Sequence, residues 1–321
     1  MTTLLFLVAV AEVFAKVARP LWGGPLRAVR RVKSGIFRRA KRPVWFRVGD
    51  YYLLAHPSKS PGDGLAQFTF SIGLTPRFPR TVAMDRFLDP ETTVFEHCVP
   101  SGGVAFDVGA AIGTTVLALA DRVGPAGKVL AFEPVPENVD LLSQTLARND
   151  LRQCELIDKA VWHTSGEQQR IVWSATTHVH GTMFNLDELL SRPRAHARYV
   201  EECMVETVAL KDVISQYGVH VDLLKIDVQG SEVAVLEGLG DAAEAVSTVF
   251  VELHDTIGER GVTTVFEMLK GAGYDIYGLK RGGFAVRLDS PMPLTAALLA
   301  PTGPSALHVI GSRAGGASQL F

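Results

Sequence analysis

Beyond Ser101, short apolar runs alternate along the chain with segments in which apolar residues recur every three or four positions. The first pattern is typical of strands buried on both faces, and the second is typical of amphipathic helices. This alternation predicts an α/β fold in which helices cover both faces of a mostly parallel sheet. The predicted strands are 104–108, 128–133, 155–161, 223–228, 249–253, 274–277 and 284–288. The predicted helices are 115–122, 138–149, 210–217, 232–239 and 265–271.

The remaining segments lack this alternation. Residues 46–99 contain strand-like pieces at 51–55 and 67–72, and we interpret them as a preface that packs on the main domain. Residues 166–207 are polar and irregular, which predicts either a functional segment such as a substrate lid or a part with its own structure. Residues after Pro291 do not resemble core. The resulting division of the chain is 1–45, 46–100, 101–290 as the main domain, and 291–321.

The amino terminus combines an apolar run at 4–11 with a basic stretch at 16–47 that contains no acid. The apolar run is shorter than the roughly 18 to 20 residues that span a bilayer. One interpretation is an interfacial helix with a polybasic segment, so that residues 1–42 contact an anionic membrane surface. The alternative is a helix that packs on the main domain with solvated arginines. Basic segments also attract nucleic acid, which we do not expect as the partner.

Composition narrows the class of protein. The chain has 321 residues, of which 47% are hydrophobic and 21% charged, so it can bury one large core or two modest ones and is not a disordered or fibrous protein. Its three cysteines, Cys98, Cys154 and Cys203, are too scattered for a disulfide framework or a structural zinc site. Buried, reduced thiols are therefore expected, which points to the cytoplasm.

A glycine-bearing turn follows the first strand of the main domain, between Asp107 and Gly113. Glycines at such a turn let a ligand approach the backbone, and the helix N-terminus that follows offers free N–H groups. The dinucleotide pattern Gly-x-Gly-x-x-Gly is not met, because Ala111 and Thr114 occupy its second and third glycine positions. An acid at position 107 is a poor neighbour for phosphate but attracts an ammonium or sulfonium group. These features favour S-adenosylmethionine, with Glu133 at the end of the next strand as the ribose anchor.

Three motifs occur in one order along the chain: Asp-Val-Gly-Ala-Ala-Ile-Gly at 107–113, Phe-Glu-Pro-Val-Pro-Glu-Asn at 132–138, and Leu-Leu-Lys-Ile-Asp-Val-Gln-Gly-Ser-Glu at 223–232. In these motifs the chain resembles the FkbM family of methyltransferases, and the likeness covers roughly residues 91–286. The resemblance implies a class I methyltransferase fold, with a seven-stranded sheet whose last strand is antiparallel. It also implies methylation of a hydroxyl oxygen.

The resemblance assigns cofactor contacts by position. The residues that would surround the amino-acid end of S-adenosylmethionine are Asp107, Gly109, Ala110 and Gly113. Glu133, with Pro134 beside it, would hold the ribose, and the region from Asp158 to Val161, with Asp158 and Ala160 as its candidate contacts, would hold the adenine. The sequence departs from the family at Ala111, where asparagine is usual, and at Gln229, where glutamate is common. Both departures remove polar groups or charge, so an altered affinity is expected.

Candidate catalytic residues follow two later strands. Methyl transfer from a sulfonium depends chiefly on alignment, and a general base helps to deprotonate a hydroxyl acceptor. Asp227 follows the fourth strand, and Glu252 and His254 end the fifth on one strand face. Because its pKa suits neutral pH, His254 is the first choice for the base and Asp227 the second. Alternatively, His254 is a hydrogen-bonded strand-end residue, and Asp227 and Glu232 orient backbone or cap a helix. Asp227 could also ligate magnesium, but no second and third carboxylate clearly complete a site, so no metal ligands are assigned.

Other functions stay open at this point. One is an NAD-dependent oxidoreductase or epimerase, which the glycine spacing and the absence of a Tyr-x-x-x-Lys pattern oppose. Another is a non-catalytic, membrane-tethered binding protein with the same fold. The acceptor is expected to be a small molecule or a glycan, and sugars, polyketides, lipid-linked glycans and small alcohols are all compatible, because this type of fold hosts many substrates.

Overall fold

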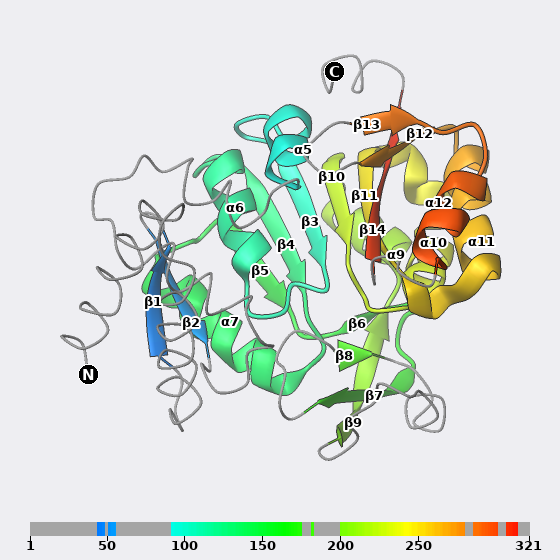
Figure 1. Ribbon diagram of the computed structural model, residues 1–321. Helices are drawn as coiled ribbons and strands as arrows, with labels where there is room; N and C mark the ends of the chain where they lie inside the picture. Colours follow the sequence, from blue (N-terminus) through cyan, green and yellow to red (C-terminus); the bar gives the residue numbers. More distant parts are fainter. Residues whose placement is uncertain are drawn as a thin grey trace, which may run out of the picture.

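The computed structural model describes residues 44–48, 51–55, 91–174, 181–182, 200–279, 285–300 and 306–313. Within them, an eight-stranded sheet forms the centre of the molecule (Figure 1). Its strands, in spatial order, are β13 (Ala285–Arg287), β12 (Asp275–Leu279), β14 (Ala306–Ser312), β11 (Val246–His254), β10 (Val221–Ile226), β3 (Val104–Val108), β4 (Lys128–Phe132) and β5 (Cys154–Ile157).

Strand direction confirms a mostly parallel sheet. The run β11–β10–β3–β4–β5 is parallel throughout. Strand β14 is antiparallel to both of its neighbours, β11 and β12, so β12 points the same way as the parallel strands. Strand β13 pairs antiparallel with β12 at the edge. The described sheet therefore has eight strands with two antiparallel members, whereas seven strands with an antiparallel last strand were expected.

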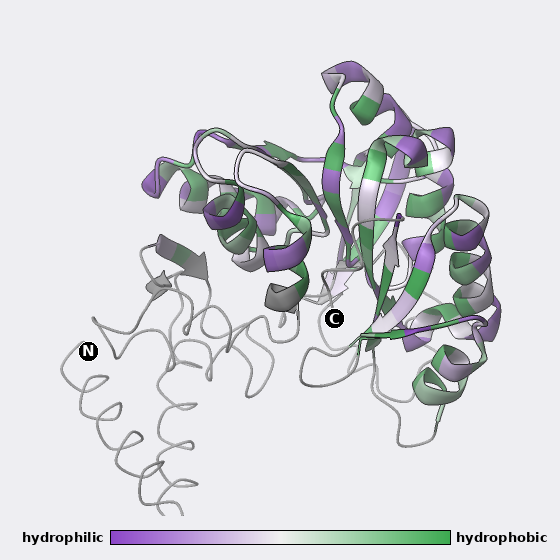
Figure 2. Ribbon diagram, turned by 90° about the horizontal axis from the view of Figure 1, so that it is seen from above, coloured by the Kyte–Doolittle hydropathy of each residue, from purple (hydrophilic) through white to green (hydrophobic). Residues whose placement is uncertain are grey.

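Helices cover both faces of the sheet. The helices in chain order are α5 (Glu91–Cys98), α6 (Thr114–Val123), α7 (Pro136–Arg148), α9 (Leu210–Tyr217), α10 (Glu232–Leu239), α11 (Gly258–Gly271) and α12 (Met292–Leu298). Side chains of α5, α6 and α7 pack with Ala105, Leu223 and Phe250 in one core, whereas those of α9 to α12 pack with Phe106, Leu224 and others in a second. Hydrophobic and hydrophilic residues succeed one another along these helices (Figure 2). This is the pattern of helices that have one apolar and one polar face. All five helices predicted for the main domain are confirmed, with α11 longer than predicted.

The carboxyl-terminal part of the chain belongs to the core. Leu294 and Leu298 of α12 are buried, as are Val309 and Ile310 of β14. Strand β14 inserts between β11 and β12, where it pairs with β11 along its whole length. The expectation that residues after Pro291 lie outside the core is therefore wrong for α12 and β14. A seven-residue strand that returns to the sheet after a break in the pattern leaves little periodicity in the sequence.

The region expected to be irregular contains a second sheet. Strands β7 (Gln168–Ser174) and β9 (Val200–Val208) form an antiparallel pair, which β8 (Gly181–Thr182) and β6 (Ala160–Val161) extend to four strands. The strand predicted at 155–161 is therefore divided between the two sheets, as β5 and β6. This small sheet has its own core, formed by Val135, Ala160, Ile171, Trp173 and Val205. The alternative that residues 166–207 have their own structure is confirmed for the part that the structure describes.

Near the amino terminus, β1 (Val44–Val48) and β2 (Tyr51–Ala55) form a hairpin, and the strand predicted at 51–55 is confirmed. The Asn149 side chain, which follows α7, accepts a hydrogen bond from the Tyr52 backbone N–H and donates one to its carbonyl, each at 2.6 Å. This hairpin therefore packs on the main domain. No helix among the described residues is long and apolar enough to cross a membrane. The predictions for residues 1–42 and for the strand at 67–72 lie outside the described residues.

Candidate functional site

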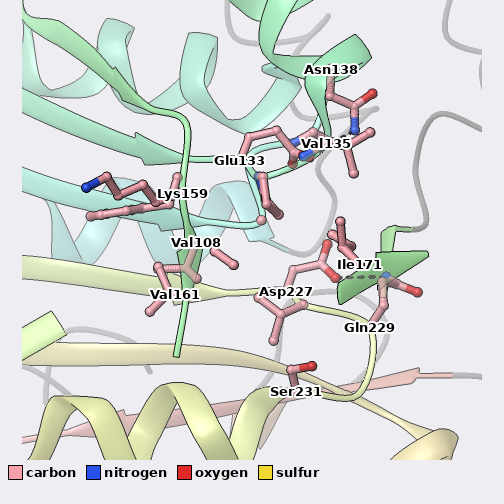
Figure 3. Close-up of a pocket in the computed structure, with 16 residues that line it drawn as sticks. Val108, Glu133, Val135, Asn138, Lys159, Val161, Ile171, Asp227, Gln229 and Ser231 are labelled. Carbon is pink, nitrogen blue, oxygen red and sulfur yellow. Dashed lines mark hydrogen bonds between the residues drawn. The ribbon is translucent and has the colours of Figure 1, made fainter. Parts of the chain in front are cut away.

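A pocket lies at the carboxyl ends of β3, β4 and β10, with the small sheet along one side (Figure 3). Parallel α/β sheets commonly bind ligands at this edge, outside the carboxyl ends of their strands. The residues that line the pocket are Val108, Gly109, Ala111, Phe132, Glu133, Pro134, Val135, Asn138, Lys159, Ala160, Val161, Ile171, Asp227, Val228, Gln229 and Ser231.

The turn after β3 is shaped by left-handed backbone at three positions. Gly109, Ala111 and Gly113 have φ values of 84°, 48° and 94°. A Cβ at residue 109 would lie 1.9 Å from the backbone oxygen of Asp227, so only glycine allows the turn to approach the end of β10 this closely. Gly113 precedes α6, whose N-terminus has no side-chain cap. Asparagine tolerates left-handed backbone better than alanine does, which gives a physical reason for the asparagine usual at position 111.

Glu133 is buried at the base of the pocket, with 4% of its surface exposed. Its carboxylate accepts hydrogen bonds from the backbone N–H of Ala111 (2.8 Å), the backbone N–H of Val135 (2.9 Å) and the side chain of Asn138 (3.2 Å). Burial raises the pKa of Glu133 to about 7, although these three donors favour the charged form. Glu133 thus contacts the glycine turn and also lines the pocket, where a ribose hydroxyl could donate a hydrogen bond to its carboxylate (Figure 3).

Asp107 is fully buried and is not among the residues that line the pocket. Its Oδ1 lies 3.3 Å from the Nζ of Lys225 on the adjacent strand β10, and burial raises its pKa while Lys225 opposes this rise. Its Oδ2 has no hydrogen-bond partner among the described residues. The Lys225 ammonium therefore offsets part of the negative charge expected to attract a sulfonium. Ala110 and Gly113 likewise shape the turn without lining the pocket.

The region expected to hold the adenine is only partly confirmed as pocket lining. Ala160 lines the pocket, whereas Asp158 is exposed and is not part of its lining. Lys159 and Val161, which belong to the same predicted region, line the pocket as well. Ile171 also lines it, although the sequence did not identify this residue. Ile171 belongs to β7, in the region interpreted as irregular, so no periodic signal pointed to it.

Asp227, Glu252 and His254, hereafter the Asp227 cluster, come together at the ends of β10 and β11. The Nε2 of His254 lies 3.7 Å from Asp227 Oδ1 and 3.7 Å from Glu252 Oε1. The proximity of Glu252 and His254 confirms that they share one strand face. Of the three, only Asp227 lines the pocket.

Glu232 completes this arrangement from α10. It is fully buried, and its Oε1 accepts hydrogen bonds from His254 Nδ1 at 2.8 Å and from the Gly230 N–H at 3.0 Å. Burial disfavours the charged ring of His254, but Glu232, Asp227 and Glu252 outweigh this effect and raise the pKa of His254. Burial likewise disfavours the Glu252 carboxylate, yet His308, His254 and Lys225 lower its pKa to about 2. A raised pKa leaves less neutral imidazole at pH 7, which weakens His254 as a general base.

Comparisons with known proteins show which family the chain resembles. The family model described as the methyltransferase FkbM domain matches residues 107–276. Methyltransferase sdnD of Sordaria araneosa is 32% identical over 208 residues, which are 56% of this chain and 79% of that protein. The 31-O-demethyl-FK506 methyltransferase FkbM of Streptomyces tacrolimicus is 32% identical over 201 residues, 54% of this chain and 74% of that protein.

Among solved structures, methyltransferase FkbM from Methylobacillus flagellatus KT aligns with a TM-score of 0.38 at 14% identity. The alignment covers 72% of this chain and 54% of that chain. The family match includes the glycine turn, Glu133 and the Asp227 cluster, so it spans the residues that form the pocket and its surroundings.

Proposed function

The chain belongs to the FkbM family of S-adenosylmethionine-dependent methyltransferases, and from this premise we propose that it methylates a hydroxyl oxygen of a sugar, lipid-linked or secondary-metabolite acceptor. The observation that carries the proposal is the pocket, whose walls come from all three motifs of the sequence: the turn after β3, the end of β4 and the end of β10. One relative is named for methylation of an oxygen on a natural product, which supports a hydroxyl acceptor.

Two features of the pocket fit S-adenosylmethionine, the turn at Gly109 and the buried carboxylate of Glu133. The turn at Gly109 leaves no room for a Cβ, and buried Glu133 faces the pocket with its carboxylate. Glu133 would hold the ribose, the turn the amino-acid end, and Ala160 with Ile171 the adenine. When bound, the cofactor supplies an activated methyl group on a sulfonium. The protein's own contribution is to align donor and acceptor and to exclude water, an effect worth up to about 7 to 11 kcal/mol.

The acceptor hydroxyl is proposed to bind beside Asp227, the member of the Asp227 cluster that lines the pocket. His254 and Glu252 adjoin it, each near enough to influence a hydroxyl placed there. Substituting His254 with Asn should reduce turnover while leaving cofactor binding intact. Unchanged turnover would remove His254 from the chemistry.

The test is transfer of label from methyl-labelled S-adenosylmethionine into a native extract, followed by mass spectrometry of the labelled product. We expect a labelled methyl ether, formed by the full chain and lost in Gly109→Val, whose side chain fills the turn. A melting temperature raised by NAD and unchanged by S-adenosylhomocysteine would favour the oxidoreductase. Cofactor binding without any transfer would favour a non-catalytic binding protein.

A cytoplasmic location and a peripheral membrane contact through residues 1–42 are further proposals. Their support is the basic stretch at 16–47 and the scarcity of cysteine. Flotation with anionic liposomes tests the membrane contact. If binding persists after deletion of residues 1–42, the contact lies elsewhere.

A further inference from the structure

We propose that the Asp227 cluster is a binding site for one divalent metal cation, held beside the methyl-transfer pocket. Asp227, Glu252 and His254 each offer one ligand atom, and these atoms all lie within 4.8 Å of one another. Atoms that share a cation at about 2.1 Å lie roughly 3 to 4 Å apart, so a small contraction would let all three coordinate one ion.

His254 is oriented as a metal ligand. Its side chain is only 9% exposed, and its Nδ1 hydrogen bonds to the buried Glu232 carboxylate at 2.8 Å. A carboxylate acceptor keeps the proton on Nδ1, which leaves the Nε2 lone pair directed at Asp227 and Glu252. Asp227 Oδ1 and Glu252 Oε1 are each 3.7 Å from His254 Nε2, which is beyond hydrogen-bond distance. Among the described residues, Nε2 has no hydrogen-bond partner, and a carboxylate holds the other ring nitrogen. This is the arrangement that orients histidine ligands around metals.

The two carboxylates are also held from behind. Asp227 has its Oδ2 3.6 Å from Lys225 Nζ, and its Oδ1 accepts a hydrogen bond from Gln229 at 3.0 Å. Glu252 has its Oε2 3.7 Å from His308 Nε2, while its Oε1 faces His254. Supporting groups of this kind fix the orientation of carboxylate ligands. Two carboxylates and one neutral imidazole together carry a charge of −2, which matches a divalent cation. A proton on His254 Nε2 would compete with the cation for the same position.

The ligand set of two oxygens and one nitrogen suits a first-row divalent ion such as Mn²⁺. Three protein ligands would leave further coordination positions open, and Asp227 itself lines the pocket (Figure 3). There the cation would bind the acceptor hydroxyl and lower its pKa, so that its proton passes to water. This use of the cation rests on the proposed function. It makes His254 a ligand and no longer the base.

The experiment is a titration of the full chain, freed of metal with EDTA and then dialysed, with Mn²⁺ alone, followed by electron paramagnetic resonance of free Mn²⁺. We expect one Mn²⁺ per chain. Asp227→Asn and Glu252→Gln should weaken binding at least about tenfold, because each removes a charged ligand. Glu232→Gln should weaken it about 10- to 100-fold through the orientation of His254. Glu244→Gln, at an exposed acid outside the cluster, is the matched control and should bind as the wild type does.

Folding and function are followed in the same samples by circular dichroism and by calorimetry with S-adenosylhomocysteine. Absence of Mn²⁺ binding in the wild type overturns the metal site, as does binding that Glu252→Gln leaves unchanged in a folded sample. If S-adenosylhomocysteine binds and methyl transfer continues in EDTA, the role of the cation in methyl transfer fails and the proposed function stands. If Mn²⁺ binds and S-adenosylhomocysteine does not, the metal site stands and the proposed function fails.

Discussion

The buried carboxyl of Glu133 predicts that cofactor affinity rises with pH across neutrality. Burial moves its pKa from 4.5 to about 7, which corresponds to about 3 kcal/mol against the charged form. A ribose hydroxyl donates to a carboxylate and favours its charged form, so binding selects ionised Glu133. With a pKa near 7, the ionised fraction rises about tenfold between pH 6 and pH 8. The Kd of S-adenosylhomocysteine should therefore fall about tenfold over this interval and level off above it.

Isothermal titration calorimetry at pH 6, 7 and 8 measures this directly. Binding at pH 6 should also take a proton off the protein, so the apparent enthalpy should depend on the ionisation enthalpy of the buffer. Glu133→Gln has no ionisable group at this position and should bind more weakly, with a nearly constant Kd. The reasoning is refuted if the wild-type Kd is the same at pH 6 and pH 8, or if Glu133→Gln keeps the full dependence.

The same pKa determines how Glu133 affects the stability of the free protein. Because its folded pKa lies above its ordinary value, the folded state binds the extra proton between about pH 4.5 and pH 7. Unfolding therefore becomes easier as pH rises through this window, and the cost of the buried charge is fully present above pH 7. S-Adenosylhomocysteine should offset part of that cost, so its stabilising effect on the melting temperature should be larger at pH 8 than at pH 6.

Three further substitutions test the packing around the site. Ala111→Gly should raise the free energy of unfolding by about 0.5 to 1 kcal/mol, measured by denaturant titration, because glycine adopts the φ of 48° without strain. Lys225→Met should lower it by about 3 to 5 kcal/mol by leaving Asp107 unpaired, and adding Asp107→Asn should recover much of the loss. Gly238→Ala should lower it by about 1 to 3 kcal/mol, because its Cβ would lie 2.0 Å from the Trp162 carbonyl oxygen, and an unchanged melting temperature would contradict that contact.

Local sequence was sufficient for the cofactor turn and for most of the elements. The glycine turn and Glu133 could be predicted because strand, turn and helix follow one another within about 30 residues, and each leaves a local pattern. Strand β14 could not, because no local pattern shows that a later strand inserts between β11 and β12. The small sheet was missed for a related reason: β7 and β9 pair across an interval whose sequence is polar. No sequence pattern therefore indicated that Ile171 of β7 lines the pocket.

The Lys225 contacts were also missed, although a signal for them was present. Asp107 is the single charged residue of β3, and Lys225 lies between apolar residues of β10, three positions after Asp222. A charge in a buried strand requires a partner. The register of the two parallel strands places them directly opposite one another. Adjacent strands with one acid and one base at matching positions could have predicted the pair, given the strand order. What the sequence alone lacked was that order, because β3 and β10 are more than 100 residues apart.

Lys225 links the cofactor turn to the side of the pocket where we propose that the acceptor binds. Its ammonium lies 3.3 Å from Asp107, beneath the glycine turn, and 3.6 Å from Asp227, which lines the pocket. Both carboxylates are stabilised by one buried positive charge, so a change in the charge of either alters the field at the other. A cation or a proton at the Asp227 cluster would draw Asp227 away from Lys225 and leave the ammonium more fully available to Asp107. Occupation of the acceptor side should thus change the electrostatic environment beneath the cofactor turn, even though no residue of the Asp227 cluster belongs to that turn.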